Sequence, residues 1–266
     1  MRFFRAAIAK EKITENEFGE LLFDLSADGG WEEKDAFVLS FEETKLANFQ
    51  SKLLSLSAKI DPIVDEDWKE NWKKFLKPEQ ILDKIWVVPF GMEKPNMAEK
   101  IIWIEPGMAF GTGGHESTRI AMKLILETDL SNRSVLDIGA GSGILSICAK
   151  MFGAKSVFSV DIDPEVMENF ERNCQLNDVT DCQLEIKDMT KPFETSADLI
   201  ISNVLFSINR KILQQLVKSG FSGQIVISGM IEQEKEIVQS ELEKLEMSMI
   251  KIKRENEWFG VIAEKG

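Results

Sequence analysis

Residues 134–161 read SVLDIGAGSGILSICAKMFGAKSVFSVD, and the fold class follows from this stretch. A short, mostly apolar run leads into three alternate glycines, an apolar helical segment follows, and a second apolar run ends at a carboxylate. Strand, glycine turn, helix and strand in this order form half of a nucleotide-binding βαβ unit. Glycines let the backbone turn tightly and approach a ligand closely, with the helix N-terminus directly behind the turn.

The spacing of these glycines narrows the choice of ligand. A dinucleotide fingerprint, G-x-G-x-x-G, would need a third glycine at Ile144 or Ser146, and a P-loop would need Gly-Lys-Ser/Thr after the turn. Neither pattern is present. The chain instead has D-x-G-x-G-x-G starting at Asp137, with Asp161 placed 22 positions after Gly139. This arrangement resembles the S-adenosylmethionine site of doubly wound methyltransferases.

The resemblance implies that the glycine turn lies along the amino-acid part of the cofactor, and that Asp161 accepts both ribose hydroxyls. An ionised carboxylate is acceptor-only and can receive two O–H donors at once, so Asp161 suits this task. Asp163 is the neighbouring alternative, but it lies beyond the predicted strand, beside Pro164. The plainer alternative is a glycine turn in a βαβ unit that holds another ligand or none.

Composition sets limits on the class of protein. A chain of 266 residues has room for one large domain and one small one. Its net charge of −13 and pI near 4.8 argue against a large nucleic-acid surface and are compatible with a cationic protein partner, although an acidic surface explains them equally well. No apolar run approaches the length of roughly 20 residues that spans a bilayer.

Cysteine and histidine usage points to a reducing compartment without a metal site. The three cysteines show no metal or redox spacing, and the chain has one histidine. The first residues lack the long apolar segment of a signal peptide. We therefore expect a cytoplasmic protein that uses no metal.

The apolar periodicity divides the chain into three parts. Residues 1–62 read as a small βαββαβ module of ferredoxin-like type, in which Thr14 and Glu17 form a capping-box pattern and nothing suggests catalysis. We expect Asp28-Gly29-Gly30 to end its first helix. Residues 63–80 read as a helical linker with Trp68 and Trp72 on one stripe. Residues 81–266 read as the doubly wound α/β domain, with seven strands that end in an antiparallel hairpin; residues 81–89 and 100–105 look like strands that lead into it.

A second glycine-rich loop, residues 106–115, opens onto a helix predicted to begin near Glu116. Hydroxyls early in that helix, Ser117 and Thr118, can face a ligand beneath the loop. His115 could act as a general base, but a helix cap or a loop-positioning residue is the favoured interpretation.

Two polar residues stand at strand ends, where open α/β sheets bind their ligands. Asn203 ends the fourth predicted strand and is therefore placed for chemistry. Asp188 follows the third strand, at a position where methyltransferases often hold the adenine amine with a carboxylate.

Taken together, these segments resemble one family over essentially the whole chain: the bacterial methyltransferases of the eleventh large-subunit ribosomal protein. The most specific matches are the DW and WK pairs at 67–68 and 72–73, the loop 106–113, the turn 137–143, VDIDP at 160–164 and NVL at 203–205. The resemblance implies a seven-stranded S-adenosylmethionine-dependent domain, an N-terminal substrate-recognition domain, and methylation of lysine side chains or the N-terminal amine of that ribosomal protein. It implies cofactor contacts at Thr118, Gly139, Gly141, Asp161, Asp188 and Asn203, no metal, and a monomer.

The chain departs from the family pattern at two places. Gly114 stands where the family usually has Thr or His, and Glu116-Ser117-Thr118 stands where it often has Pro-Thr-Thr. Phe206 turns the family's N-[IL]-L-A motif into N-x-x-F, halfway to the N-P-P-[FY] motif of enzymes that methylate planar amide or base nitrogens. The alternatives are therefore an N-methyltransferase of a glutamine amide or a nucleobase, or a non-catalytic ribosome-assembly factor that binds the cofactor.

We expect direct transfer of the sulfonium methyl to an amine held in line with the S–CH₃ bond. The side-chain carbonyl of Asn203 would accept an amine N–H, and main-chain carbonyls at the strand end could accept the second. A lysine amine, with a pKa near 10.4, must first lose a proton, and that proton would leave to water because Asn203 is too weak a base.

Overall fold

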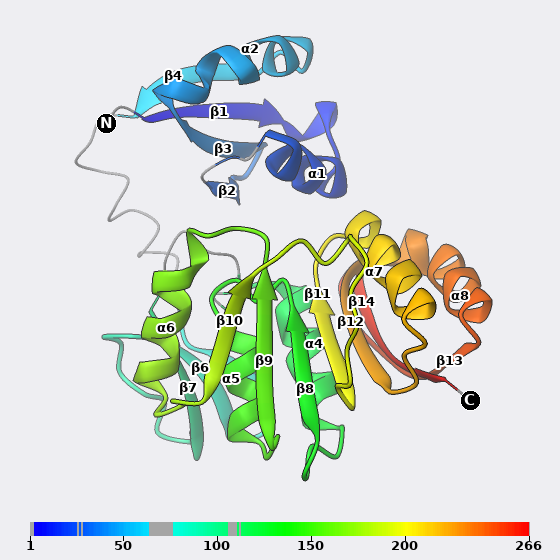
Figure 1. Cartoon of the computed structure of the whole chain (residues 1–266). Helices are drawn as coiled ribbons and strands as arrows, with labels where there is room; N and C mark the ends of the chain where they lie inside the picture. Colours follow the sequence, from blue (N-terminus) through cyan, green and yellow to red (C-terminus); the bar gives the residue numbers. More distant parts are fainter. Residues whose placement is uncertain are drawn as a thin grey trace. The chain divides into compact units, whose positions relative to one another are not determined.

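The computed structural model divides into two compact units, residues 1–76 and 77–266 (Figure 1). It describes residues 3–25, 27, 29–63, 77–105, 111 and 113–265. Most of the predicted helical linker, with Trp68 and Trp72, lies outside the described residues, as do residues 106–110 and 112 of the second glycine loop. Within the described part, no helix is long and apolar enough to cross a membrane.

The N-terminal unit is a ferredoxin-like βαββαβ module, as predicted. Its sheet has the strand order β2-β3-β1-β4, and all three strand pairs are antiparallel. The elements are β1 (Phe3–Ala9), α1 (Glu15–Leu25), β2 (Gly29–Glu32), β3 (Ala36–Glu42), α2 (Leu46–Ser55) and β4 (Lys59–Ile63). The pair Gly29-Gly30 was expected only to end the first helix. It begins strand β2 instead, which pairs with β3.

Local sequence signals and aromatic packing hold this unit together. The capping box forms: the Thr14 amide donates to Glu17 Oε2 at 2.8 Å, and the Glu17 amide donates to Thr14 Oγ1 at 3.3 Å. Below the helices, the rings of Phe41 and Phe49 stack with centroids 4.4 Å apart, and Leu53 is fully buried. The module therefore has its own core.

The second unit is built on a mixed sheet of seven strands, ordered β10-β9-β8-β11-β12-β14-β13. The first five run parallel, and the last two form the predicted antiparallel hairpin. The strands are β8 (Ser134–Ile138), β9 (Ser156–Asp161), β10 (Cys182–Ile186), β11 (Leu199–Asn203), β12 (Gln224–Ile231), β13 (Met247–Glu255) and β14 (Trp258–Lys265). This is the doubly wound architecture that the glycine stretch indicated.

Helices cover both faces of this sheet, and each face has its own apolar core (Figure 1). One core contains residues of α4 (Glu116–Leu126), α5 (Ile144–Met151) and α6 (Val166–Leu176). The other contains residues of α7 (Phe206–Lys218) and α8 (Lys235–Lys244), which follows a short 3₁₀ turn at Glu232–Glu234. A separate sheet of three strands, β5 (Glu79–Leu82), β6 (Ile85–Pro89) and β7 (Lys100–Ile104), precedes the large one; the sequence indicated strands here but not their pairing.

The crossover from β10 to β11, residues 187–198, contains no helix in the described structure. Two of its side chains, Met189 and Phe193, are buried against the core that α7 and α8 cover. They occupy part of the sheet face that a crossover helix covers in a fully wound sheet.

The strand order has its switch point between β8 and β11. From β8 the chain passes through α5 to β9 on one side, whereas β11 lies on the other side of β8. Ligands of open α/β sheets bind at such a switch point, beyond the carboxyl ends of the strands. The glycine turn follows β8 here, and Asn203 is the last residue of β11.

We predict that Thr14→Ala loosens α1. The substitution removes the hydroxyl that accepts the helix's early amide, so the first turn should open more often. Hydrogen exchange followed by mass spectrometry should show about fivefold faster exchange of the first-turn amides. Thr44→Ala, which removes an exposed hydroxyl bonded to Glu42, is the control and should change this exchange little. Equal exchange in both variants would contradict a stabilising cap.

Candidate active site

The backbone and the packing of the turn require glycine. Gly139, Gly141 and Gly143 have φ values of +77°, +51° and +81°, which place them in the left-handed region. A Cβ on Gly139 would collide with the side chain of Val204, and one on Gly143 would lie 2.8 Å from the ring of Phe170. The turn therefore packs directly against the residue that follows Asn203.

Asp161 is hydrogen-bonded to this turn. Its Oδ2 accepts from the Gly141 amide at 2.8 Å, and its Oδ1 accepts from the Asp163 amide at 3.0 Å. Burial raises the pKa of Asp161, and the backbone donors oppose this shift. Asp163, the alternative from sequence, instead accepts the Glu165 amide at 2.9 Å just before α6. Each Asp161 oxygen keeps a second lone pair, so the carboxylate can still receive hydroxyl donors.

Asp137 lies fully buried at the end of β8. Its Oδ2 accepts from Ser146 Oγ at 2.5 Å, and Ser146 lies 2.7 Å from the hydroxyl of Ser159. Its Oδ1 has no partner among the described residues. Burial raises the pKa of Asp137 to about 7, the Ser146 bond opposes this shift, and the nearby charge of Asp161 adds to it. A buried carboxyl that titrates near neutrality therefore lies in the strand that leads into the turn.

Asn203 and Thr118 are brought together at the end of β11. The Asn203 amide, in a residue that is 8% exposed, donates to Oγ1 of the fully buried Thr118 at 3.3 Å. The amide oxygen of Asn203 has no hydrogen-bond partner in the described structure. A buried polar atom without a partner is costly unless a ligand or water completes it. This oxygen is thus a buried acceptor whose hydrogen bonding is incomplete in the described structure.

The second glycine loop is tied to the first. The hydroxyl of Ser142, within the glycine turn, donates to the Gly111 carbonyl at 2.6 Å. Gly111 has a φ of +108°, and a Cβ there would lie 2.6 Å from that hydroxyl. The ring nitrogen Nδ1 of His115 accepts from the Ser117 amide at 3.1 Å, so His115 caps α4 as expected. The glycine turn is therefore bonded directly to Gly111, one of the described residues of the second loop.

A model of one family, described as ribosomal protein L11 methyltransferase, matches residues 9–266 of this chain. The chain belongs to the ribosomal protein L11 methyltransferase family. The likeness from sequence is confirmed, and with it an enzyme that uses S-adenosylmethionine as methyl donor.

Individual relatives agree with this assignment. A ribosomal protein L11 methyltransferase of Clostridium botulinum is 32% identical over 232 residues, which cover 85% of this chain and 74% of the relative. One from Thermoanaerobacter pseudethanolicus is 31% identical over 230 residues, covering 86% and 74%. The crystal structure of a ribosomal protein L11 methylase from Lactobacillus delbrueckii subsp. bulgaricus aligns with a TM-score of 0.65 and 29% identity, over 72% of this chain and all of that one.

The residues present fit the cofactor of this methyltransferase family. The turn is a run of left-handed glycines directly before the N-terminus of α5, with the Asp161 carboxylate bonded to it. Asp188 accepts the amide and hydroxyl of Thr190, and these bonds and Lys191 lower the pKa of Asp188. It stands two residues beyond β10, and its contact with adenine stays a prediction. Among the described residues, no group of acidic, cysteine and histidine side chains could hold a metal ion.

Phe206, the departure that suggested another acceptor, is the first residue of α7 and is buried in the core beneath it. The Phe206 ring therefore packs inside the protein and does not present an exposed aromatic surface to a substrate. The likeness to the N-P-P-[FY] motif is limited to the residue type.

Asn173, on the buried side of α6, was missed from sequence. Its side-chain oxygen accepts the Glu105 amide at 2.7 Å, and its nitrogen donates to the Ser142 carbonyl at 2.9 Å. It joins the residue before the second loop to the glycine turn. The signal was a polar residue beside Phe170 and Cys174 on the apolar face of a helix.

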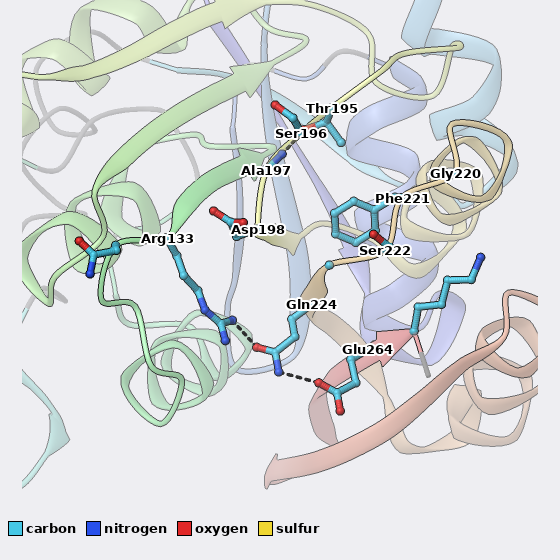
Figure 2. A pocket seen from close by; sticks show the side chains of 13 residues that line it. Arg133, Thr195, Ser196, Ala197, Asp198, Gly220, Phe221, Ser222, Gln224 and Glu264 are labelled. Atoms are coloured by element: carbon cyan, nitrogen blue, oxygen red, sulfur yellow. Dashed lines mark hydrogen bonds between the residues drawn. The ribbon is translucent and has the colours of Figure 1, made fainter.

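A cavity of about 540 Å³ lies at the amino ends of β8, β11 and β12, at the opposite end of these strands from the glycine turn (Figure 2). Its polar side chains bind one another: Arg133 donates to Gln224, and Gln224 donates to Glu264 at 2.7 Å. The cavity is separate from the glycine turn and offers no unpaired buried group among the described residues.

We predict that Gly139→Ala impairs cofactor binding. The left-handed backbone costs a non-glycine residue about 1–2 kcal/mol, and the new methyl group must also displace Val204. Calorimetry should show at least about tenfold weaker binding of S-adenosylmethionine, roughly that free energy. Gly153→Ala is the control, because Gly153 has a φ of +113° with nothing within 4 Å of its would-be Cβ. It should lower stability and leave cofactor affinity unchanged; equal affinity losses would refute a specific role for the turn.

We predict that Asp137→Asn changes the pH dependence of stability. The folded protein holds the Asp137 proton up to about pH 7, whereas the unfolded chain loses it near pH 4. Wild type should therefore lose stability relative to the variant as the pH rises from about 4 to about 7, by roughly 1.4 kcal/mol per pH unit. Below and above this window the difference should stay constant. Urea unfolding of both cofactor-free proteins across this range measures it, and parallel curves would contradict a buried neutral carboxyl.

Proposed function

We propose that this methyltransferase modifies ribosomal protein L11, at lysine side chains or at its N-terminal amine, and that Asn203 orients the attacking nitrogen. Membership of the family and the names of its relatives support the substrate. The observation that carries the role of Asn203 is its buried, unpaired amide oxygen at the carboxyl end of β11, next to the glycine turn.

The cofactor supplies an electrophilic methyl group on a sulfonium. The glycine turn and Asp161 hold it, and Asn203 Oδ1 accepts one N–H of the neutral amine, which directs the nitrogen lone pair towards the methyl carbon. The bound cofactor would give its methyl group to the nitrogen that Asn203 holds, so an N–CH₃ bond would replace the S–CH₃ bond, and the resulting ammonium would lose its proton to water. Most of the rate enhancement in this scheme comes from alignment of the two reactants.

The N-terminal unit is the proposed recognition domain for the ribosomal protein, with boundaries at 1–62, a linker at 63–80 and the catalytic domain at 81–266. All proposed site residues lie in the second unit, and the first has its own core, which supports this division of labour. The acidic balance of the chain suits a cationic partner rather than nucleic acid. We further propose a cytoplasmic monomer, and the free cysteines Cys148, Cys174 and Cys182 suit a reducing compartment.

Mass spectrometry of purified L11 incubated with the protein and S-adenosylmethionine tests the reaction. Wild type should add mass in steps of about 14 Da on amines, and Asn203→Ala should lower kcat about 100-fold with cofactor affinity retained. Asn177→Ala is the matched control, because its amide bonds the backbone of Trp103 outside the site. It should lower stability and keep kcat.

The outcomes separate substrate from mechanism. Unmodified L11 with intact cofactor binding would sink the proposed substrate and favour another nitrogen acceptor or a non-catalytic factor. Full turnover by Asn203→Ala would leave the substrate standing and remove the orienting role of Asn203.

A further inference from the structure

A second asparagine, Asn209, lies at the end of the first turn of α7, and its side chain is buried, with 1% of the residue exposed. Its side-chain oxygen accepts from Ser202 Oγ at 2.7 Å. Its nitrogen donates to the Val204 carbonyl at 2.8 Å and to the Ser228 carbonyl at 3.0 Å. One amide group therefore uses its oxygen and both of its N–H groups inside the protein.

These three partners surround Asn203. Ser202 and Val204 are its neighbours in the chain, and Ser228 is its register partner on β12. Asn209 thus contacts the backbone or side chain on each side of Asn203 without touching Asn203 itself.

The Val204 carbonyl is also confined from the opposite direction. Gly229 lies at an irregularity of β12, with a φ of +82°, and a Cβ there would collide with this carbonyl oxygen. The carbonyl is held between the Gly229 backbone and the Asn209 amide, so the peptide that follows Asn203 has little freedom to rotate.

The same contacts limit the acceptors at the strand end. The carbonyls of Val204 and Ser228 already receive Asn209, and the Ser228 hydroxyl donates to the Ser117 carbonyl at 2.8 Å. The unpaired acceptor in this group is the amide oxygen of Asn203. The carbonyls of Val204 and Ser228 each accept one Asn209 N–H and keep a second lone pair, so an amine contact with a main-chain carbonyl stays a prediction.

We propose that Asn209 is a positioning residue for methyl transfer: its buried amide fixes the strand end on both sides of Asn203 and so holds the Asn203 oxygen where the amine nitrogen binds. This rests on the proposed function, because it concerns the residue that orients the attacking amine. A displacement of about 1 Å at such a residue reduces the rate by up to about 100-fold.

The test uses the full-length protein, S-adenosylmethionine and purified L11, with single-turnover rates measured at saturating cofactor. Asn209→Leu keeps the number and branching of the side-chain heavy atoms and removes every hydrogen-bonding group, so it should lower the rate at least about tenfold while the cofactor Kd changes less than about threefold. Asn209→Ser leaves room for a water to hydrate the two carbonyls. The serine variant should therefore fold even if the leucine variant does not. It should show the same loss of rate.

Leu213→Ala is the matched control. Leu213 lies one turn further along the same face of α7 and is 2% exposed, so its truncation lowers the melting temperature through a cavity. The rate per folded molecule should stay within about twofold of wild type, because the leucine side chain has no polar group with which to hold the strand end.

A double-mutant comparison separates positioning from stability. In an Asn203→Ala background, Asn209→Leu should reduce the rate little further, because the group that it positions is gone. An unchanged rate in both Asn209 variants, or equal rate losses with and without Asn203, would overturn the inference while leaving the proposed function intact. If wild type leaves L11 unmodified, the proposed function fails and this inference fails with it.

Discussion

The close approach of Gly139 to Val204 is the contact on which the rest of the site depends. It brings the ends of β8 and β11 together with no side chain from the turn between them. Only glycine adopts the left-handed backbone of position 139 at little cost. The geometry of this contact therefore depends on the residue type at a single position. This contact fixes the position of the glycine turn, to which Asp161 is hydrogen-bonded, relative to the strand end that carries Asn203.

Around the contact, the interior is polar where an apolar core would be simpler. Buried side chains of Ser142, Asn173 and Asn209 join α6, α7 and the two glycine loops through backbone carbonyls. On α4, the buried Thr118 hydroxyl accepts the side-chain amide of Asn203. Such groups are favourable only when nearly every donor and acceptor is satisfied. The two exceptions among them and their neighbours, the oxygens Oδ1 of Asp137 and Asn203, both lie at the carboxyl end of a central strand.

Sequence reasoning reached the parts of this arrangement that are encoded locally. The turn, the strand-end carboxylate and the cap of α4 by His115 each depend on residues close together in the chain, so their spacing carries the information. The pairing of β5, β6 and β7 depends on contacts between separate segments, which apolar periodicity does not specify. Asn173 and Asn209 were missed because an amide on a helix reads as surface, although both interrupt an apolar face. Gly29-Gly30 resembled a helix end because glycine marks turns and strand starts alike.

The helix-free crossover between β10 and β11 is held to the sheet by very few buried side chains. Residues 187–198 cross a sheet face with two buried side chains, Met189 and Phe193, while most of their neighbours are partly or fully exposed. A crossover helix would spread its burial over a whole stripe and tolerate the loss of any one contact. Here the ordering entropy of the segment is offset largely by the burial of two side chains, so its fixed course depends on Met189 and Phe193 far more than on the residues between them.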